Sequence, residues 1–388
     1  MKKKIAIIGS TGSIGKKTFS IVKNNPKDFE IVLLTTNKNL NELYKQVKLC
    51  KVKNIIITSK NHFIKAKKKF KKKQLKIFND LNYINKIFKK KIDYTMCSIS
   101  GLDGLKPTLD SIKFSKKVAI ANKESIICAW NLINKQLKKF KTKFIPVDSE
   151  HFSIWSLINE KNKSNISKIY ITASGGPFLN LPINKFKYIN PKKATNHPRW
   201  KMGKKISIDS ATMMNKVFEV IEAQRIFNVD INKFEILIHP NSYLHAIVKF
   251  NNGLIKMLFH DTDMKIPIFN SLYSDKVKKL NTKNINLTNL NNLNLSYPDF
   301  NRFKSLKILK KITNNISLYE TVLITANDQL VEYFLRGKIK FSDINKNLIK
   351  IVNLKQFKNY QSKKPRDIRQ IHYLIEQVRL KTKYLCIK

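Results

Sequence analysis

The stretch IAIIGSTGSIGKKT, residues 5–18, constrains the fold of this chain more than any other segment. A short apolar run ends at Gly9, glycines recur at Gly12 and Gly15, and a helical pattern begins directly afterwards. A strand-to-helix turn without side chains lets a pyrophosphate approach the backbone N–H groups at the helix N-terminus. The spacing is not the common G-x-G-x-x-G, so a plain tight turn is the alternative. The order of strand, loop and helix favours a dinucleotide site.

Apolar runs and helical stretches alternate through the first 150 residues, as they do in βαβ units that form a parallel sheet. We therefore expect an α/β protein whose residues 1–150 form a Rossmann-like, NADP-binding domain. Mixed helical and antiparallel signals at 151–275, with a hairpin turn at 251–253, predict a central α+β catalytic domain. An Asn-rich linker at 276–298 and a C-terminal helical domain at 299–388 complete the expected organisation. The strands expected in the first domain are 5–8, 31–34, 55–58, 94–98, 118–121 and 144–147.

The end of the second expected strand, LLTTNKN, indicates which dinucleotide binds. NAD sites usually place Asp or Glu there to hold the ribose hydroxyls. Here Lys38 and Asn39 stand at the strand end without an acid, which suits a 2′-phosphate. The sequence therefore favours NADP.

The net charge of +50 raises the alternative of a nucleic-acid-binding protein. Of the 76 basic residues, only seven are Arg and 69 are Lys. Nucleic-acid interfaces usually recruit Arg for its bidentate contacts, and the Lys residues are spread along the whole chain. We therefore expect no specific nucleic-acid partner. The densest run, residues 65–76, is predicted to be an amphipathic helix with a cationic outer side.

Cysteine usage and hydropathy indicate the compartment. The four Cys residues form no CxxC pair, which fits a reducing cytoplasm. No apolar stretch approaches the roughly 20 residues of a membrane span. The apolar run after the N-terminal Lys residues is too short for a signal peptide. The expectation is a cytoplasmic protein without a membrane partner.

Two acids follow a strand-like run in IPVDSEHFSIW, residues 145–155. Asp148 and Glu150 are either half of a metal site or part of a solvated turn in which Asp148 or Ser149 caps a helix. A third acid is available in the segment 205–227, where Glu219 lies on a predicted helix. The alternative for Glu219 is a solvated helix face.

Small and cationic residues suggest a phosphate site beside that helix. Ser210, Asn215 and Lys216 fall near its expected N-terminus, which Asp209 or Ser210 can cap. Ser174 precedes two glycines that allow close backbone approach to an anion. His197 and Trp200 lie in a cationic loop that could close over a substrate; the alternatives are a structural loop histidine and a packing anchor. Lys123, after a strand, could bond substrate hydroxyls or be one more surface Lys.

Together these motifs resemble the 1-deoxy-D-xylulose 5-phosphate reductoisomerase family. The matching stretches are GSTGSIG, ANKES, PVDSEH, SGGPF, HPRWKMGKKISIDSATMMNK and LIHPNS, with a weaker match in TANDQLVEYFL. The resemblance implies conversion of 1-deoxy-D-xylulose 5-phosphate to 2-C-methyl-D-erythritol 4-phosphate in non-mevalonate isoprenoid synthesis. It also implies NADPH, a Mg²⁺ or Mn²⁺ ion with Co²⁺ as a further option, and a homodimer built across the middle domain. Another NADP-dependent phosphosugar reductase is the alternative enzyme.

The resemblance also implies residue roles. The metal ligands would be Asp148, Glu150 and Glu219, and the catalytic residues Lys123, Glu150, His197 and Trp200. The substrate would contact Lys123, Ser149, Glu150, Ser174, His197, Ser210, Asn215, Lys216 and Glu219. The cofactor would contact Thr11, Gly12, Ser13, Ile14, Asn37, Lys38, Asn39, Asn122, Glu124 and Gly203. The chain departs from the family pattern at Asn37, Val217, His260 and Thr262 without losing a proposed ligand.

Overall fold

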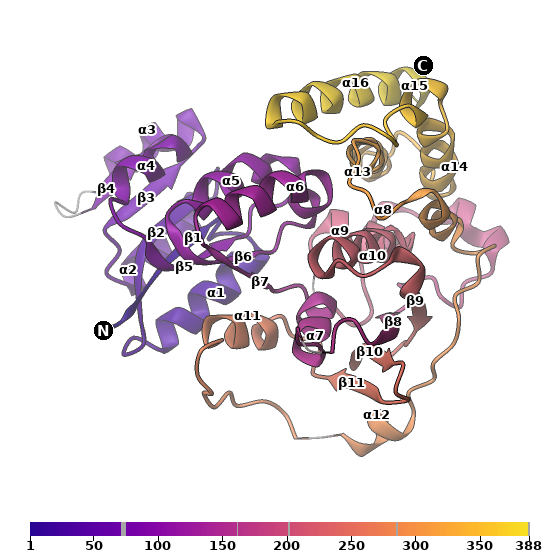
Figure 1. Cartoon of the computed structure of the whole chain (residues 1–388). Coiled ribbons are helices and arrows are strands. Elements are labelled where there is room, and N and C mark those ends of the chain that lie inside the picture. The colour runs from indigo at the N-terminus through magenta and orange to yellow at the C-terminus, as the bar shows by residue number, and fades with distance from the viewer. Residues whose placement is uncertain (71–74, 161, 201, 285, 387–388) are drawn as a thin grey trace. The chain divides into compact units, whose positions relative to one another are not determined.

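The computed structural model describes residues 1–70, 75–160, 162–200, 202–284 and 286–386 (Figure 1). The chain forms two compact units, each assembled from separate segments. Unit 1 contains Met1–Ser125, Leu132–Phe152 and Met264–Asn281. Unit 2 contains Ile126–Asn131, Ser153–Asp263 and Thr282–Lys388.

Unit 1 is built on a seven-stranded sheet in the order β4-β3-β2-β1-β5-β6-β7, and every neighbouring pair is parallel. The chain winds outward from β1 to β4 and then returns to β5 on the other side of β1. This arrangement confirms the predicted Rossmann-like α/β fold. The strands are β1 Lys3–Ile8, β2 Phe29–Thr36, β3 Asn54–Ile57, β4 Lys76–Phe78, β5 Ile92–Cys97, β6 Ser115–Ile120 and β7 Lys143–Pro146. All six predicted strands are present, and β4 was not predicted.

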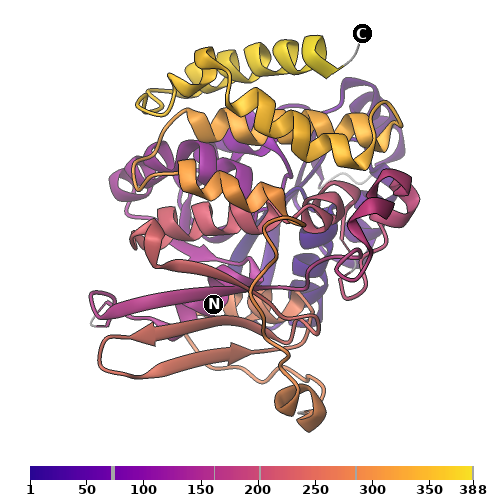
Figure 2. The ribbon, with the colours of Figure 1, turned by 90° about the vertical axis from the view of Figure 1, so that its right-hand side faces the viewer.

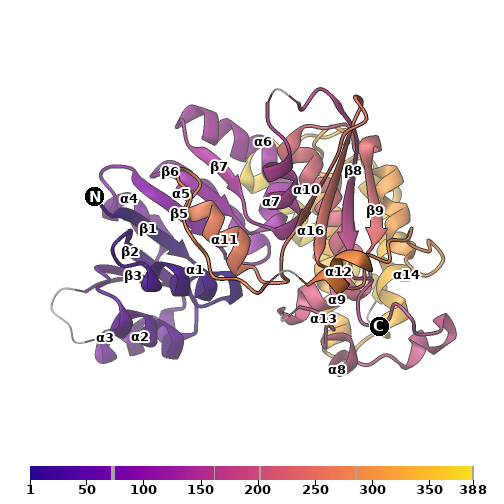
Figure 3. The same cartoon turned by 90° about the horizontal axis from the view of Figure 1, so that it is seen from below.

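Helices cover both faces of this sheet, because successive residues of the central strand are buried on opposite sides. Ile5 and Ile7 belong to one apolar cluster, and Ala6 and Ile8 belong to another. Helix α11 is added to the first cluster from far along the chain and packs against α1 (Figure 3). The helices are α1 Ser13–Asn24, α2 Leu40–Leu49, α3 Lys60–Lys69, α4 Ile84–Ile87, α5 Leu105–Ile112, α6 Lys123–Lys139 and α11 Lys265–Leu272.

The lysine-rich segment predicted as one helix over 65–76 is only partly helical. Helix α3 ends at Lys69, and Lys76 already begins β4. Residues 71–74 lie outside the described residues. The predicted helix was therefore too long at its C-terminal end, because Lys76 pairs with Asn54 of β3 in the parallel sheet.

Unit 2 contains a mixed sheet in the order β11-β10-β8-β9. Strand β9 runs parallel to β8, whereas β10 is antiparallel to both β8 and β11. Figure 2 shows the long β10–β11 hairpin, whose turn contains Gly253 at φ 86°, as predicted. The strands are β8 Ile166–Ala173, β9 Phe234–Ile238, β10 Leu244–Phe250 and β11 Ile255–Phe259.

The C-terminal part of unit 2 is helical, as predicted. Its helices are α13 Tyr319–Leu335, α14 Phe341–Val352, α15 Lys355–Lys358 and α16 Ile368–Cys386. The segment predicted as a linker contains one short helix, α12 Leu287–Asn291, and Ser296 bridges to Ile238 of β9. The remaining helices are α7 Ser149–Leu157, α8 Pro191–Ala194, α9 Lys204–Ala211 and α10 Met214–Phe227. Within the described ranges, none of the helices combines the length and apolar character that crossing a membrane requires.

Candidate active site

The glycine loop between β1 and α1 depends on the absence of side chains. Gly9 has φ 87°, and a Cβ there would lie 2.9 Å from the backbone carbon of Ser98. Gly12 is the N-cap of α1 and is exposed, so no capping side chain covers the first N–H groups of that helix. Ser13 and Ile14 form its first turn. This loop can therefore present backbone donors to a pyrophosphate.

The end of β2 lies next to the glycine loop. Thr11 Oγ1 and Thr36 Oγ1 are 2.7 Å apart, so the loop is tied to the last residue of β2. Asn37 and Lys38 follow directly and are exposed. Asn39 caps α2, because its Oδ1 accepts the Glu42 N–H at 3.1 Å. Asn37 and Lys38 are therefore the two polar side chains of this segment available to a cofactor.

Asn122 shapes the neighbouring edge of the sheet. Its Oδ1 accepts the Ser125 N–H at 2.6 Å, and its Nδ2 donates to the carbonyls of Ile99 and Gly101. It thus caps α6 and fastens the loop after β5. Glu124 lies in the first turn of α6 and is buried.

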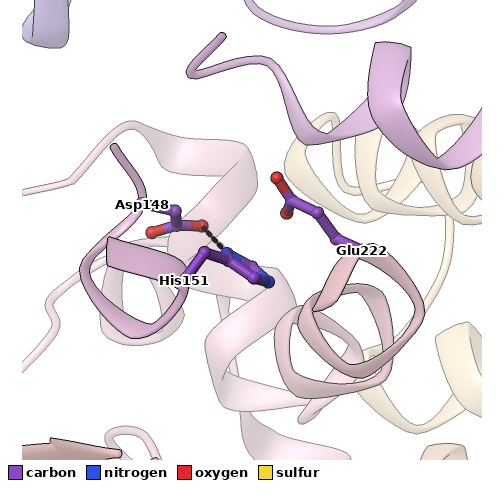
Figure 4. A group of neighbouring side chains, drawn as sticks. All are labelled: Asp148, His151 and Glu222. Atoms are coloured by element: carbon purple, nitrogen blue, oxygen red, sulfur yellow. Dashed lines mark ion pairs between the residues drawn. The ribbon is translucent and has the colours of Figure 1, made fainter. Parts of the chain in front are cut away.

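The opening acids of α7 are organised within unit 1. Asp148 Oδ1 accepts the Ser149 N–H at 2.9 Å, while its Oδ2 lies 3.0 Å from Lys123 Nζ. Ser149 Oγ donates to Glu150 Oε2 at 2.6 Å. His151 Nδ1 lies 3.9 Å from Asp148 Oδ2 (Figure 4). One carboxylate oxygen of Asp148 thus meets the first N–H of α7, and the other faces a cation.

The charged groups around Asp148 favour its ionised form. Burial alone would raise the pKa of Asp148, but the Lys123 ammonium outweighs burial and holds this pKa below its ordinary value. Lys123 is buried, so it is not one more solvated surface Lys. An ionised carboxylate beside a compensating ammonium is a group that a divalent cation can take as a ligand.

A separate cluster of candidate residues lies in unit 2, at the end of β8. Ser174 Oγ accepts the Gly176 N–H at 3.1 Å and lies 3.1 Å from His197 Nε2. Gly175 and Gly176 have φ 81° and 71°. A Cβ on Gly176 would lie 3.0 Å from the Ser210 carbonyl oxygen, so the glycine loop packs directly against the end of α9. Ser174, His197 and Ser210 are thereby brought to one place.

His197 is neutral and has a defined tautomer. Burial, with a further contribution from the Lys216 charge, lowers its pKa to about 4. Its Nδ1 accepts backbone N–H groups from Arg199 at 3.2 Å and Trp200 at 3.0 Å. Nδ1 therefore carries no proton, and Nε2–H is the donor that faces Ser174.

The helix predicted over this region is two helices, and its predicted cap is wrong. Asp209 and Ser210 lie inside α9, and α10 begins only at Met214. The residue before α10 is Met213, which has φ 61° and no capping hydrogen bond from its side chain. Asp209 cannot cap, because its carboxylate is buried and accepts a hydrogen bond from Asn327.

Asn215, Lys216 and Glu219 share one face at the start of α10. Asn215 Nδ2 donates to Glu219 Oε1, and Lys216 Nζ lies 2.5 Å from Glu219 Oε2. Glu219 is 1% exposed, so the alternative of a solvated helix face is wrong. Both of its oxygens are oriented by neighbours one turn away. A buried carboxylate whose two oxygens are held by the Asn215 amide and the Lys216 ammonium suits a metal-ligating role.

Trp200 lies against His245 of the hairpin. Its ring is 6.1 Å from that of His245 at 72°, and His245 stacks on His260 with ring centroids 3.6 Å apart. Gly203 is exposed and is the N-cap of α9. Val217, one of the departures from the family pattern, is fully buried in α10 and packs as core.

His151 and His245 were not predicted as site residues. His151 follows Glu150 directly, but a single His in a helical pattern carries no sequence signal for an ion pair. His245 sits in an alternating strand pattern, where it resembles an ordinary inward-facing residue. The β10–β11 register shifts at His245, between Leu244 and Ala246, so regular strand pairing would not have brought it to His260 either.

Comparison with known proteins places these features in one family. Three sequence models match: 1-deoxy-D-xylulose 5-phosphate reductoisomerase over residues 5–130, and its C-terminal domains over residues 144–227 and 260–381. The chain is 60% identical over 381 residues, 98% of both chains, to the curated 1-deoxy-D-xylulose 5-phosphate reductoisomerase of Pelagibacter ubique. The chain belongs to the 1-deoxy-D-xylulose 5-phosphate reductoisomerase family.

Solved reductoisomerases have the same fold. The Zymomonas mobilis enzyme in complex with NADPH is 30% identical, with a TM-score of 0.89 and full coverage of both chains. A reductoisomerase in complex with NADPH, fosmidomycin and magnesium is also 30% identical, with a TM-score of 0.90 over 98% of each chain. Membership of this family agrees with the glycine loop and the α7 acids of unit 1. It also agrees with the small, polar and acidic candidate residues of unit 2.

Proposed function

We propose that this reductoisomerase rearranges 1-deoxy-D-xylulose 5-phosphate and reduces the rearranged aldehyde with NADPH to 2-C-methyl-D-erythritol 4-phosphate. The observation that carries the proposal is the 60% identity over 98% of the chain to a curated enzyme of that name. The site chemistry supports it, because a dinucleotide loop, hard carboxylates and a phosphate-type donor cluster occur in one chain.

Asp148, Glu150 and Glu219 would hold the metal. Three carboxylates without a Cys ligand suit Mg²⁺ or Mn²⁺, with Co²⁺ as a further option. Asp148 and Glu150 belong to unit 1, and Glu219 belongs to unit 2. A cation there would polarise the ketone and stabilise charge on the substrate oxygens.

The substrate phosphate would be held by Ser174, His197, Ser210, Asn215 and Lys216. The geometry supports this set, because the Nε2–H of His197, the hydroxyl of Ser174 and the end of α9 lie together. All but Lys216 are neutral donors, and the Lys216 charge complements a dianion.

The rest of the substrate would contact residues of α6 and α7, namely Lys123, Ser149 and Glu150. Lys123 would orient the substrate hydroxyls as a buried ammonium. Trp200 would belong to a loop that closes over the substrate and excludes water.

NADPH would bind at the β1–α1 loop, with its pyrophosphate on the helix N-terminus and its 2′-phosphate near Asn37 and Lys38. Thr11 and Asn39 would fix the two loops, and Asn122 and Glu124 would shape the adjoining edge. Gly203, the N-cap of α9, would be a further cofactor contact.

We further propose a cytoplasmic homodimer built across the middle part of the chain. Strand β11 is an edge strand. Its residues Ile255 and Met257 are 55% and 42% exposed, and Leu254 just before it is 57% exposed. An exposed apolar edge strand suits pairing with a second copy of the chain. The free cysteines, Cys50, Cys97, Cys128 and Cys386, fit a reducing compartment. Light scattering of the parent and of Ile255→Lys tests the dimer.

The function is tested by NADPH oxidation with the purified protein. Oxidation should require both 1-deoxy-D-xylulose 5-phosphate and Mg²⁺, and omission of either should return the rate to background. Oxidation that proceeds with other phosphosugars and without metal would favour the alternative of a general phosphosugar reductase.

A further inference from the structure

Helix α13 meets α9 through a buried polar pair. Asn327 Nδ2 donates a hydrogen bond to Asp209 Oδ1 at 2.7 Å. The two residues are 0% and 2% exposed, so neither is hydrated. Lys205 extends the contact outward, because its Nζ lies 2.8 Å from Asp328 and 3.6 Å from Asp209. The segment TANDQLVEYFL, which no role in the reaction has explained, thus carries two polar residues that hold α9.

The link between α9 and α10 is also held by a hydrogen bond from another segment. Ser305 Oγ donates to the Thr212 carbonyl, at the link between α9 and α10. The next residue, Met213, has a positive φ of 61°, a conformation that non-glycine residues adopt only where the surroundings impose it. Asp209 and Thr212 are therefore fixed on either side of Ser210, just before the helix that carries Lys216.

We propose that Asp209 and Asn327 are positioning residues that set the geometry of the substrate-phosphate site. A buried carboxylate–amide pair adds little net stability over an apolar pair, but it specifies one relative placement of its two helices. A shift of α9 would move Ser210 and also the Gly176 loop packed on it. Contacts from the C-terminal helical part would thus fix the positions of the residues that bind the substrate phosphate. This inference rests on the proposed function of that site.

The test compares four variants with the parent protein by steady-state kinetics with 1-deoxy-D-xylulose 5-phosphate, NADPH and Mg²⁺. Asn327→Leu removes the donor and leaves Asp209 buried without it. The double variant Asp209→Asn/Asn327→Asp exchanges donor and acceptor, so the hydrogen bond can form again in reverse. Ser305→Ala removes the second tether with little change in volume. Thr321→Val, at a buried position of α13 away from these contacts, is the matched control.

Asn327→Leu should raise KM for the sugar phosphate about tenfold or more while kcat changes less than about threefold, since a misplaced binding group costs affinity steeply. NADPH affinity, measured by fluorescence titration, should stay at the parent value because the cofactor loop lies in unit 1. The double variant should recover most of the KM. Ser305→Ala should raise KM by a factor of roughly five or less, the size of one hydrogen bond, and Thr321→Val should not change it.

A purely structural role gives a different pattern. In that case the melting temperature and the active fraction fall, kcat falls with them, and KM stays at the parent value. That result would overturn the inference, as would failure of the double variant to recover KM while it folds normally. If Asn327→Leu does not fold, an unchanged KM in Ser305→Ala overturns the inference. If the parent protein does not turn over the sugar phosphate, the proposed function itself fails.

Discussion

Replacement of His197 by Ala should raise KM for the sugar phosphate strongly and leave NADPH affinity unchanged. His197 donates through Nε2–H, which lies 3.1 Å from Ser174 Oγ in the phosphate site. A hydrogen bond to a charged group contributes about 1.5–3 kcal/mol, which corresponds to roughly tenfold to a hundredfold in KM. The assay is NADPH oxidation at saturating cofactor and Mg²⁺ with varied sugar phosphate. A KM within about twofold of the parent would refute the assignment.

Two further variants separate the phosphate contact from the support of the loop. His197 Nδ1 accepts N–H groups from Arg199 and Trp200, so part of the effect could come from a loosened loop. The amide of His197→Asn reaches the position of Nδ1, and that of His197→Gln reaches the position of Nε2. KM for the sugar phosphate should therefore be lower in the Gln variant than in the Asn variant. The opposite order would assign His197 to the loop instead.

The pKa of His197 also predicts a pH dependence. Burial, with a contribution from Lys216, lowers this pKa to about 4, below the ordinary value of 6.5. The imidazole therefore stays neutral as pH falls from 8 to 5, whereas an unfolded chain begins to bind a proton near 6.5. This residue lowers the free energy of unfolding progressively between pH 6.5 and 4. An inflection in KM near pH 6 that persists in His197→Gln belongs to the substrate phosphate, whose second pKa is about 6.

Three other outcomes are expected. Glu219→Gln should abolish turnover while NADPH binding survives, because it removes one proposed metal ligand; turnover near the parent rate at saturating Mg²⁺ would exclude Glu219 from the metal site. Lys38→Glu should lower kcat/KM for NADPH at least about tenfold, because one charge-assisted contact is lost. The preference for NADPH over NADH should therefore become smaller. An unchanged preference would place the 2′-phosphate elsewhere. His260→Gly should lower the melting temperature through loss of its stack on His245 and leave kcat/KM within a few-fold; a collapse of kcat/KM at an unchanged melting temperature would give His260 a direct role.

The parallel sheet could be predicted from the sequence because its central strands are buried on both faces. Continuous apolar runs such as Ile5–Ile8 can therefore be recognised as strands in the sequence. Strand β4 could not, because it has only three residues, Lys76–Phe78, and follows a lysine run with a helical pattern. Its strand conformation comes from pairing with β3, which is a tertiary contact.

Contacts within the candidate site were predictable where they join neighbours in the sequence. Glu219 lies one helical turn after Asn215 and Lys216, and its contacts with them follow from that spacing. The break before Met214 was not predictable, because the sequence there has neither Gly nor Pro. Distant segments contact α9 and the link that follows it, through the hydrogen bonds from Asn327 to Asp209 and from Ser305 to Thr212. The Lys123–Asp148 pair likewise requires the adjacency of β6 and β7.

The carbon skeleton of the product tests the central claim most directly. Purified protein would be incubated with ¹³C-labelled 1-deoxy-D-xylulose 5-phosphate, NADPH and Mg²⁺, and the product would be analysed by NMR. One NADPH should be oxidised per product, and the methyl group of the product should sit on a branched, oxygen-bearing carbon. An unbranched deoxypentitol phosphate would show direct reduction of the ketone and would contradict the account.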